Sequence, residues 1–307
     1  MQMSNLFRNK KEPEIICQSN KSKGVGYLVD LLCATRIGKK APKLYENRGY
    51  KMAVFSNDYI GILINQFGVY EQDELELLFE FLKPIDNVLI KGAALDIGAN
   101  IGNHSLYFSP YFQKIYCYEP SPDTYKLLEM NVKSSDNIEV YNYGLGDEEG
   151  VFFMKENRTN IGGSSVVHEK SDETIQIQIV KLDNYINELS NINFIKIDVE
   201  GFEEKVFRGG LRFIQAHQPI IVFEQDEMVF DEEETPSIVL LRKLGYQFCW
   251  QHKEKRIKST LLRKFVNFYR IVLNPKIKIV TGSRVPKQFH SMLIAIPPRF
   301  SSLLDQK

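Results

Sequence analysis

The stretch Ala94-Leu95-Asp96-Ile97-Gly98-Ala99-Asn100-Ile101-Gly102-Asn103-His104-Ser105 decides the fold. An apolar strand ends in a turn that contains glycine, and a helix begins directly after it, as in the nucleotide-binding loops of α/β proteins. Gly98 and Gly102 allow the backbone to approach a ligand closely, and the first turn of the helix presents N–H groups without partners. Asn100 and Asn103 stand where the G-x-G-x-x-G fingerprint has its second and third glycines. We therefore expect a nucleotide-type ligand and disfavour a pyrophosphate.

The chain around this loop alternates between strand and helix patterns. We expect strands at residues 88–97, 114–118, 138–143, 175–180, 194–199, 219–224, 247–250 and 292–296. We expect helices at residues 103–112, 123–133, 182–189, 203–215 and 236–244. Such alternation predicts parallel βαβ units, and hence an open, doubly wound α/β sheet with helices on both faces.

Acidic side chains follow three of the predicted strands. Glu119 ends the strand at 114–118, where doubly wound folds accept hydrogen bonds from ribose hydroxyls. Asp198 and Glu200 lie two residues apart at the carboxyl end of the strand at 194–199, so we expect them to project from the same face. Glu224 closes the next strand. Because parallel strands bring their carboxyl ends to one edge of the sheet, we expect these carboxylates to meet there.

The first 69 residues are expected to form an N-terminal extension. The first forty or so are interpreted as irregular, apart from a short amphipathic stretch at 26–35. Residues 52–56 and 59–65 are apolar or β-branched runs separated by Asn57-Asp58, a pair that suits a tight turn, and so predict a β-hairpin. A helix over 71–83, ended by Pro84, then begins a main domain of residues 70–307.

A basic insertion at about 251–290 interrupts the alternation before the last strand. Residues 251–307 contain 13 lysines and arginines but only two acids, Glu254 and Asp305. One interpretation is a basic helix whose apolar face packs on the core. The other is a surface for an anionic substrate or for peripheral contact with the inner face of the membrane.

The composition is that of an ordinary globular protein, with 43% hydrophobic and 25% charged residues among 307. The 39 basic residues equal the 39 acidic residues, so the net charge gives no reason to expect a nucleic-acid partner. The cysteines, Cys17, Cys33, Cys117 and Cys249, show no C-x-x-C spacing, which favours a reducing, cytoplasmic setting. The polar N-terminus and the lack of any run of about 18 apolar residues indicate neither a signal peptide nor a membrane span.

Six segments in this order resemble the FkbM-like family of S-adenosylmethionine-dependent methyltransferases. They are D-I-G-A-N-I-G-N-H-S (96–105), Y-E-P-S-P (118–122), G-L-G-D-E-E-G (144–150), G-G-S-S (162–165), K-I-D-V-E-G-F-E (196–203) and I-V-F-E (221–224). The resemblance covers about residues 70–227, and residues 292–297 look like the closing strand. It implies the Rossmann-like class I methyltransferase fold, with a seven-stranded, mostly parallel sheet whose last strand is antiparallel. It also implies S-adenosylmethionine as cofactor and mostly O-methylation of hydroxyls on a sugar, glycan or secondary metabolite.

The resemblance also implies which residues hold the cofactor. Asp96, Gly98, Asn100 and Gly102, with Ala99 and Asn103 beside them, would line its methionine part. Glu119, followed by Pro120, would hold the ribose, and Gly144, Leu145 and Asp147 would lie beside the adenine. Residues 161–165 would form a glycine-rich lid or acceptor loop.

A neutral hydroxyl is a poor nucleophile, so a side chain must accept its proton. The candidates are Asp198, Glu200, Glu224 and His104, of which we favour the first two. Mg²⁺ bound by the same carboxylates is a second option that we do not favour, and no metal ligands are assigned.

Three alternatives stay open. The first is an NAD-dependent oxidoreductase, and the second is a non-catalytic binding protein with a vestigial methyltransferase fold. The third is a nucleic-acid methyltransferase, which is disfavoured because Asp198-Val199-Glu200-Gly201 stands where an N-P-P-Y tetrad would be expected. The sequence does not identify the acceptor or the oligomeric state.

Overall fold

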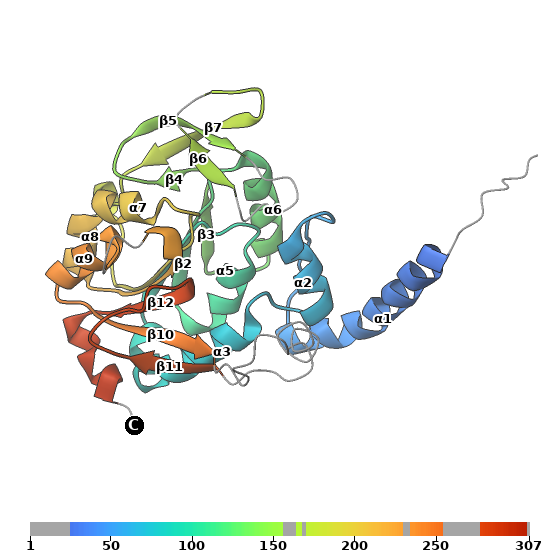
Figure 1. The fold of residues 1–307 in the computed structure, drawn as a ribbon, viewed down its shortest axis with the longest axis horizontal. Coiled ribbons are helices and arrows are strands. Elements are labelled where there is room, and N and C mark those ends of the chain that lie inside the picture. Colours follow the sequence, from blue (N-terminus) through green and yellow to red (C-terminus); the bar gives the residue numbers. More distant parts are fainter. Residues whose placement is uncertain (1–24, 156–163, 168–169, 230–233, 254–276, 306–307) are drawn as a thin grey trace, which may run out of the picture.

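The computed structural model describes residues 25–155, 164–167, 170–229, 234–253 and 277–305 (Figure 1). Its main sheet has eight strands in the order β11-β10-β12-β9-β8-β1-β2-β3. The bounds are β1 (Ala93–Ile97), β2 (Lys114–Tyr118), β3 (Ile138–Tyr141), β8 (Ile192–Ile197), β9 (Ile220–Gln225), β10 (Gln247–Lys253), β11 (Ile277–Thr281) and β12 (His290–Ile296). The strands from β3 to β9 are parallel, whereas β12 runs antiparallel to both of its neighbours, β9 and β10.

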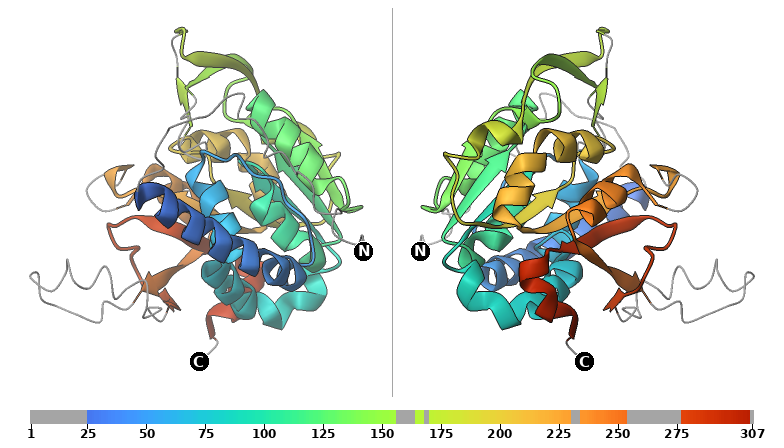
Figure 2. Two further views of the ribbon diagram at one scale, coloured as in Figure 1. Left: turned by 90° about the vertical axis from the view of Figure 1, so that its right-hand side faces the viewer. Right: turned by 90° about the vertical axis from the view of Figure 1, so that its left-hand side faces the viewer.

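Helices cover both faces of this sheet, as expected from the alternating pattern (Figure 2). One face packs against α3 (Gln72–Leu82), α4 (Asp86–Leu89), α5 (Asn103–Phe108) and α6 (Pro122–Val132). The other face packs against α7 (Glu203–Gly209), α8 (Leu211–His217) and α9 (Pro236–Lys243). Successive residues of β1 alternate between the two cores, with Ala94 in the first and Leu95 in the second. This alternation explains why β1 is buried along its whole length.

The predicted hairpin at 52–65 is wrong, because residues Tyr59–Phe67 form the helix α2. Asp58 caps this helix, and its carboxylate accepts a hydrogen bond from the backbone N–H of Gly61 at 3.0 Å. Gly61 and Ile64 are the buried residues of α2. The pair Asn57-Asp58 therefore starts a helix instead of turning a hairpin.

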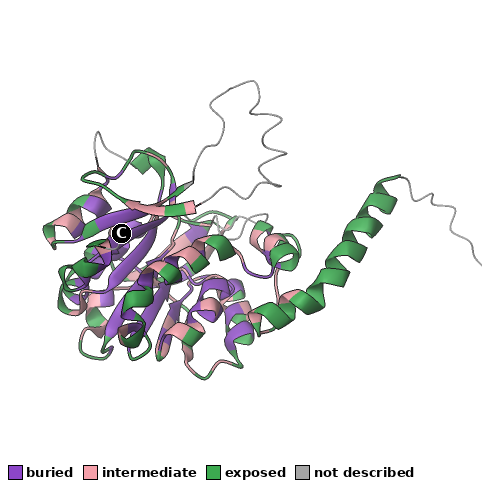
Figure 3. Ribbon diagram, turned by 90° about the horizontal axis from the view of Figure 1, so that it is seen from below, coloured by how far each residue is buried: buried purple, intermediate pink, exposed green. Residues whose placement is uncertain are grey.

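The prediction of an irregular N-terminus is also wrong for residues 25–48. They form one helix, α1 (Val25–Arg48), which is much longer than the predicted amphipathic stretch at 26–35. None of its residues is buried, and it projects from the rest of the chain (Figure 3).

Other boundaries differ where local geometry overrides the sequence pattern. The strand predicted at 88–97 begins only at Ala93, because Asp86–Leu89 is helical. The helix predicted at 182–189 is a 3₁₀ turn, Leu182–Tyr185, and the helix predicted at 203–215 is divided into α7 and α8. At that division a Cβ on Gly209 would lie 1.8 Å from the carbonyl oxygen of Gly146. The end of α7 and the backbone at Gly146 therefore meet with no room for a side chain between them.

The expected seven-stranded sheet has an eighth strand, because β11 adds antiparallel to the edge of β10. β11 belongs to the basic insertion, whose residues 254–276 lie outside the described part of the chain. A second sheet was not predicted apart from the strand at 175–180. It contains β4 (Gly144–Leu145), β5 (Gly150–Lys155), β6 (Ser165–Val167) and β7 (Thr174–Val180) in the order β4-β7-β5-β6.

Candidate active site

A cavity of about 320 Å³ lies at the carboxyl ends of β1, β2, β8 and β9. The small sheet contributes Met154, Ile177 and Ile179 to its wall. The segment between α2 and α3 contributes Tyr70 and Glu71. Residues far apart in the sequence therefore enclose one space at the edge where doubly wound folds bind their ligands.

Ten of the fifteen predicted site residues line this cavity: Gly98, Asn100, His104, Glu119, Pro120, Gly144, Leu145, Asp198, Glu200 and Glu224. The other five, Asp96, Ala99, Gly102, Asn103 and Asp147, are not among its lining residues. All four candidate proton acceptors are thus brought together. The proposed lid at 161–165 lies mostly outside the described residues, although Ser164 lines the cavity.

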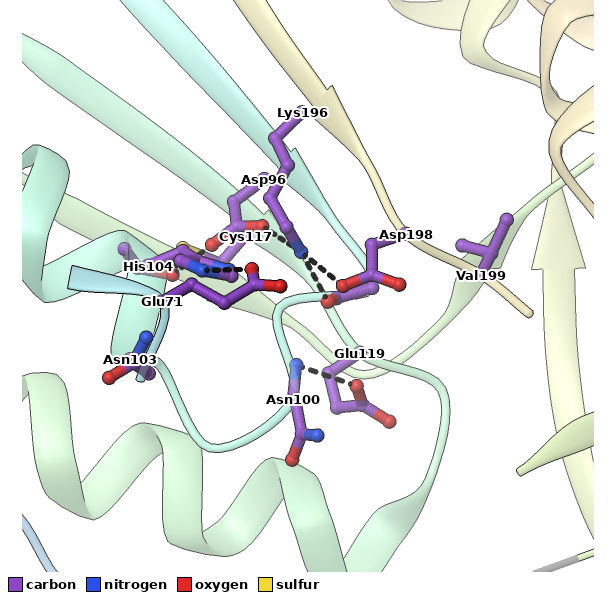
Figure 4. Close-up of polar contacts among 12 residues, drawn as sticks. Glu71, Asp96, Asn100, Asn103, His104, Cys117, Glu119, Lys196, Asp198 and Val199 are labelled. Atoms are coloured by element: carbon purple, nitrogen blue, oxygen red, sulfur yellow. Dashed lines mark hydrogen bonds and ion pairs between the residues drawn. The ribbon is translucent and has the colours of Figure 1, made fainter. Parts of the chain in front are cut away.

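Glu119 is buried at the end of β2, and its carboxylate is held by the backbone (Figure 4). Oε2 accepts a hydrogen bond from the N–H of Asn100 at 3.0 Å, and Oε1 accepts one from the N–H of Ser121 at 2.9 Å. Burial raises the pKa of Glu119 to about 7, although these two hydrogen bonds act in the opposite direction. Each carboxylate oxygen retains a lone pair for a further donor.

Lys196 was not predicted as a site residue, yet it lies at the centre of the site (Figure 4). Its Nζ lies 3.3 Å from Oδ1 of Asp96 and 3.2 Å from Oδ2 of Asp198, and it donates to the carbonyl oxygen of Gly98 at 3.2 Å. Burial alone would lower the pKa of Lys196, but the two carboxylates outweigh burial and raise it above its ordinary value. The lysine therefore links the ends of β1 and β8 as a buried cation.

The turn after β1 is shaped by this junction. Gly98 has a φ of 76°, and a Cβ there would lie 1.8 Å from the carbonyl oxygen of Asp198. Asn100 also adopts a left-handed conformation, with a φ of 50°. The sequence predicts glycine here for close approach to a ligand, but the group that approaches Gly98 is the backbone of the loop that follows β8.

Asp198 and Glu200 both line the cavity, but the strand alternation that predicted this does not apply. β8 ends at Ile197, and Glu200 has a left-handed φ of 47°. Burial, together with the charge of Asp198, raises the pKa of Glu200 to about 7. Burial and the charges of Asp198 and Glu200 raise the pKa of Glu224 to about 8. These carboxyl groups can therefore hold and release a proton near neutral pH.

His104 faces a residue that the sequence did not indicate. Its Nε2 lies 3.3 Å from Oε2 of Glu71, and its ring stacks near that of Phe108 at a centroid distance of 6.1 Å. Glu71 has a left-handed φ of 58°. Asn103 holds Tyr70, the residue that precedes Glu71. The side chain of Asn103 accepts a hydrogen bond from the N–H of Tyr70 at 3.0 Å and donates one to the carbonyl oxygen of Tyr70 at 3.1 Å. The α2–α3 segment is thereby attached to the start of α5.

Four further predicted residues do not line the cavity and lie behind it or in a neighbouring loop: Asp96, Ala99, Gly102 and Asp147. Asp96 accepts a hydrogen bond from Ser105 at 2.5 Å in addition to its ion pair with Lys196. A Cβ on Gly102 would lie 2.8 Å from Cδ1 of Leu128 on α6, so this glycine permits close packing of α6. Ala99 is buried, and Asp147 has a buried Oδ1 without a hydrogen-bond partner.

The part of the chain that the structure describes shows neither a metal-binding cluster nor a membrane-spanning helix. No group of three or more His, Cys, Asp or Glu side chains is arranged to hold a metal ion in that part of the chain. None of the described helices combines the length and the apolar character needed to cross a bilayer.

The sheet order defines the class of protein. A parallel core, β3-β2-β1-β8-β9, is followed by an antiparallel β12 inserted between β9 and β10. This is the Rossmann-like class I methyltransferase fold, here with an eighth strand at the β10 edge, and its cavity lies at the carboxyl ends of the parallel strands.

The family follows from the sequence comparison. Residues 96–248 match the model of the methyltransferase FkbM domain, and this part of the chain is a domain of that methyltransferase family. The hexuronic acid methyltransferase AglP of Haloferax volcanii is 28% identical over 205 residues, which cover 65% of this chain and 81% of AglP. Methyltransferase 1 of Beauveria bassiana is 25% identical over 187 residues, covering 48% of this chain and 73% of that protein.

A solved structure, that of methyltransferase FkbM from Methylobacillus flagellatus KT, is 15% identical with a TM-score of 0.36. The likeness covers 85% of this chain and 60% of that chain. The fold assignment rests on the sheet order and not on this likeness.

Proposed function

We propose that the chain is an S-adenosylmethionine-dependent O-methyltransferase whose acceptor is a hydroxyl of a sugar, glycan or secondary metabolite. The observation that carries the proposal is the acidity of the cavity. Among the described residues that line it, five are acidic: Glu71, Glu119, Asp198, Glu200 and Glu224. The lysine among them, Lys196, is already paired with two carboxylates. Such a site favours a cationic ligand and supplies groups that accept protons.

The residues present fit the cofactor. The cavity volume lies within the range of about 300 to 1,000 Å³ that is typical of small-molecule sites. Glu119 is fixed by two backbone N–H groups and keeps two free acceptor positions, which suit a pair of ribose hydroxyls. Gly144 and Leu145 also line the cavity, and a Cβ on Gly144 would lie 3.5 Å from Cβ of Pro120, so we assign the adenine ring to this wall.

When bound, S-adenosylmethionine supplies an electrophilic methyl group on a positively charged sulfur. The side chains of this protein then have three tasks, which are to align the acceptor, to accept its proton and to keep water out. We assign the orientation of the acceptor and the uptake of its proton to Asp198, Glu200 and Glu224, because all three carboxyl groups line the cavity. The small sheet and Phe202 form the apolar wall that excludes water.

The acceptor class is supported by the relative named a hexuronic acid methyltransferase. An NAD-dependent oxidoreductase is disfavoured, because Asn100 and Asn103 replace glycines of the dinucleotide fingerprint. A vestigial fold is disfavoured by the intact set of cavity carboxylates. The cytoplasmic location, the peripheral membrane contact of the insertion and the domain boundary at residue 69 stay predictions.

The first test is calorimetric titration of the protein with S-adenosylmethionine and S-adenosylhomocysteine, with NAD as a control and with and without Mg²⁺. We expect micromolar binding of the first two ligands, no binding of NAD and no requirement for Mg²⁺. Binding of NAD alone would overturn the proposal in favour of an oxidoreductase. If none of the ligands binds, the chain is a vestigial methyltransferase.

A further inference from the structure

The mouth of the cavity carries two exposed aromatic side chains. Tyr59, the first residue of α2, is 57% exposed, and Phe289, which precedes β12, is 54% exposed. Both line the cavity, and both come from segments outside the matched FkbM domain at 96–248. Large aromatic rings that stay exposed beside a cavity are typical of a surface that binds a ligand.

The sheet topology separates this mouth from the cofactor end of the cavity. The chain order reverses between β1 and β8, so a ligand that uses Glu119 lies over β1 and β2. Glu224 is on β9, and Phe289 leads into β12, the next strand along. The β9–β12 side of the cavity, which Phe289 and Glu224 line, is therefore left for a second substrate, and Tyr59 lines the same cavity and acts, like Glu224, on Tyr70.

Two carboxyl groups that line the cavity, those of Glu71 and Glu224, act on Tyr70. Burial raises the pKa of Tyr70, and the charges of Glu71, Asp198 and Glu224 raise it further. Burial and nearby carboxylates also raise the pKa of Glu224. A further negative charge on the acceptor would face these groups without a free cation among the described lining residues, because Lys196 is already paired.

We propose that the acceptor subsite is bounded by Tyr59 and Phe289 over the end of β9, and that it takes an uncharged sugar ring and rejects a hexuronate. The apolar C–H face of a pyranose packs on aromatic rings, and its hydroxyls donate to the carboxylates of Glu71 and Glu224. This proposal rests on the proposed function and narrows it. It separates the chain from AglP, whose name specifies a hexuronic acid.

The test is binding to the protein saturated with S-adenosylhomocysteine. Methyl glucoside, methyl mannoside and methyl galactoside are titrated beside their matched uronates, with detection by saturation-transfer NMR and calorimetry. We expect a neutral glycoside to bind at least about tenfold more tightly than its uronate, which corresponds to about 1.4 kcal/mol. Equal or tighter binding of the uronate would overturn the proposal, as would the lack of binding of every neutral glycoside.

Variants assign the effect to residues. Tyr59→Ala and Phe289→Ala should each weaken binding of the neutral glycoside at least fivefold. Above about pH 8, where Glu224 is ionised, Glu224→Gln should reduce the discrimination against the uronate severalfold. Phe67→Ala is the matched control, because Phe67 is 51% exposed on the same helix as Tyr59 but lines a separate groove. An equal effect of Phe67→Ala would refute the subsite. Failure of S-adenosylhomocysteine to bind would refute the proposed function instead.

Discussion

Replacing Lys196 by methionine should destabilise the protein strongly. Methionine fills a similar volume, but it leaves the buried Asp96 and the carboxylate of Asp198 without the ammonium group that now lies 3.3 and 3.2 Å from them. Removing one partner of a buried ion pair costs about 3 to 5 kcal/mol. With about 2.1 cal/mol/K of unfolding entropy per residue, a chain of 307 residues loses about 1.5 °C of melting temperature per kcal/mol, so we expect a decrease of at least about 4 °C.

The assay is urea and thermal unfolding of the ligand-free protein. Lys126→Met is the control, because Lys126 is 72% exposed and its ion pair with Asp123, at 2.9 Å, should contribute no more than about 1 kcal/mol. The double variant Lys196→Met/Asp96→Asn should recover part of the loss, since it removes the carboxylate left unpaired. A loss below about 1 kcal/mol for Lys196→Met would refute the buried-cation interpretation.

The pH dependence of this effect has a definite sign. The folded protein raises the pKa of Lys196, so the stability that this ammonium contributes is fully present below the unfolded value of about 10.4. It is lost only as the pH rises through the higher folded value. The ionisation of Lys196 itself should therefore add no pH dependence to the difference in stability between Lys196→Met and the unmodified protein from about pH 6 to 9.

Four further predictions concern the cavity and the cap of α2. Glu119→Gln should weaken binding of S-adenosylhomocysteine by about 1.5 to 3 kcal/mol in calorimetry, and unchanged affinity would reject the ribose assignment. Burial raises the pKa values of Glu119, Glu200 and Glu224 to about 7, 7 and 8. A cation favours their ionised forms, so affinity for S-adenosylmethionine should increase up to about tenfold from pH 6 to 8 relative to S-adenosylhomocysteine. A constant ratio of affinities would contradict this. Asp198→Asn should leave cofactor affinity within a few-fold while turnover falls by about 10²-fold or more, and unaltered turnover removes the residue from catalysis. Asp58→Ala should cost about 1 kcal/mol in urea unfolding through loss of the α2 cap, whereas an unchanged midpoint would argue against that cap.

The parts of the fold that were predicted correctly are those with strong local signals. β2 has the predicted bounds, and β1, β8 and β9 are correct as elements because buried parallel strands are continuous apolar runs with polar residues at their ends. The same signals placed Glu119 and Glu224 at one edge of the sheet. The hairpin at 52–65 failed because β-branched residues suggested strands, whereas the cap at Asp58 and burial of Ile64 stabilise a helix.

Lys196 shows that part of the missed site was already present in the pattern. Lys196 lies within β8 and precedes Asp198 by two residues. The two-residue alternation of the predicted strand at 194–199 therefore places Lys196 on the same side as Asp198. A lysine in an otherwise apolar strand must be paired when buried, and Asp96 at the same level of β1 is the register partner of Lys196. That register is a tertiary contact, which explains why composition and spacing alone did not reveal the pair.

Glu71 could not have been found in this way. Its approach to His104 depends on Asn103, which holds the backbone of Tyr70 across a separation of 33 residues, and on a left-handed backbone at Glu71 itself. Neither feature has a local sequence signal. The strand ends and turns that line the cavity around Glu119 belong to the matched domain, whereas Tyr59, Glu71 and Phe289 come from segments outside it. Under the proposed function these outer segments select the acceptor, so variants in them should change the acceptor without changing cofactor affinity.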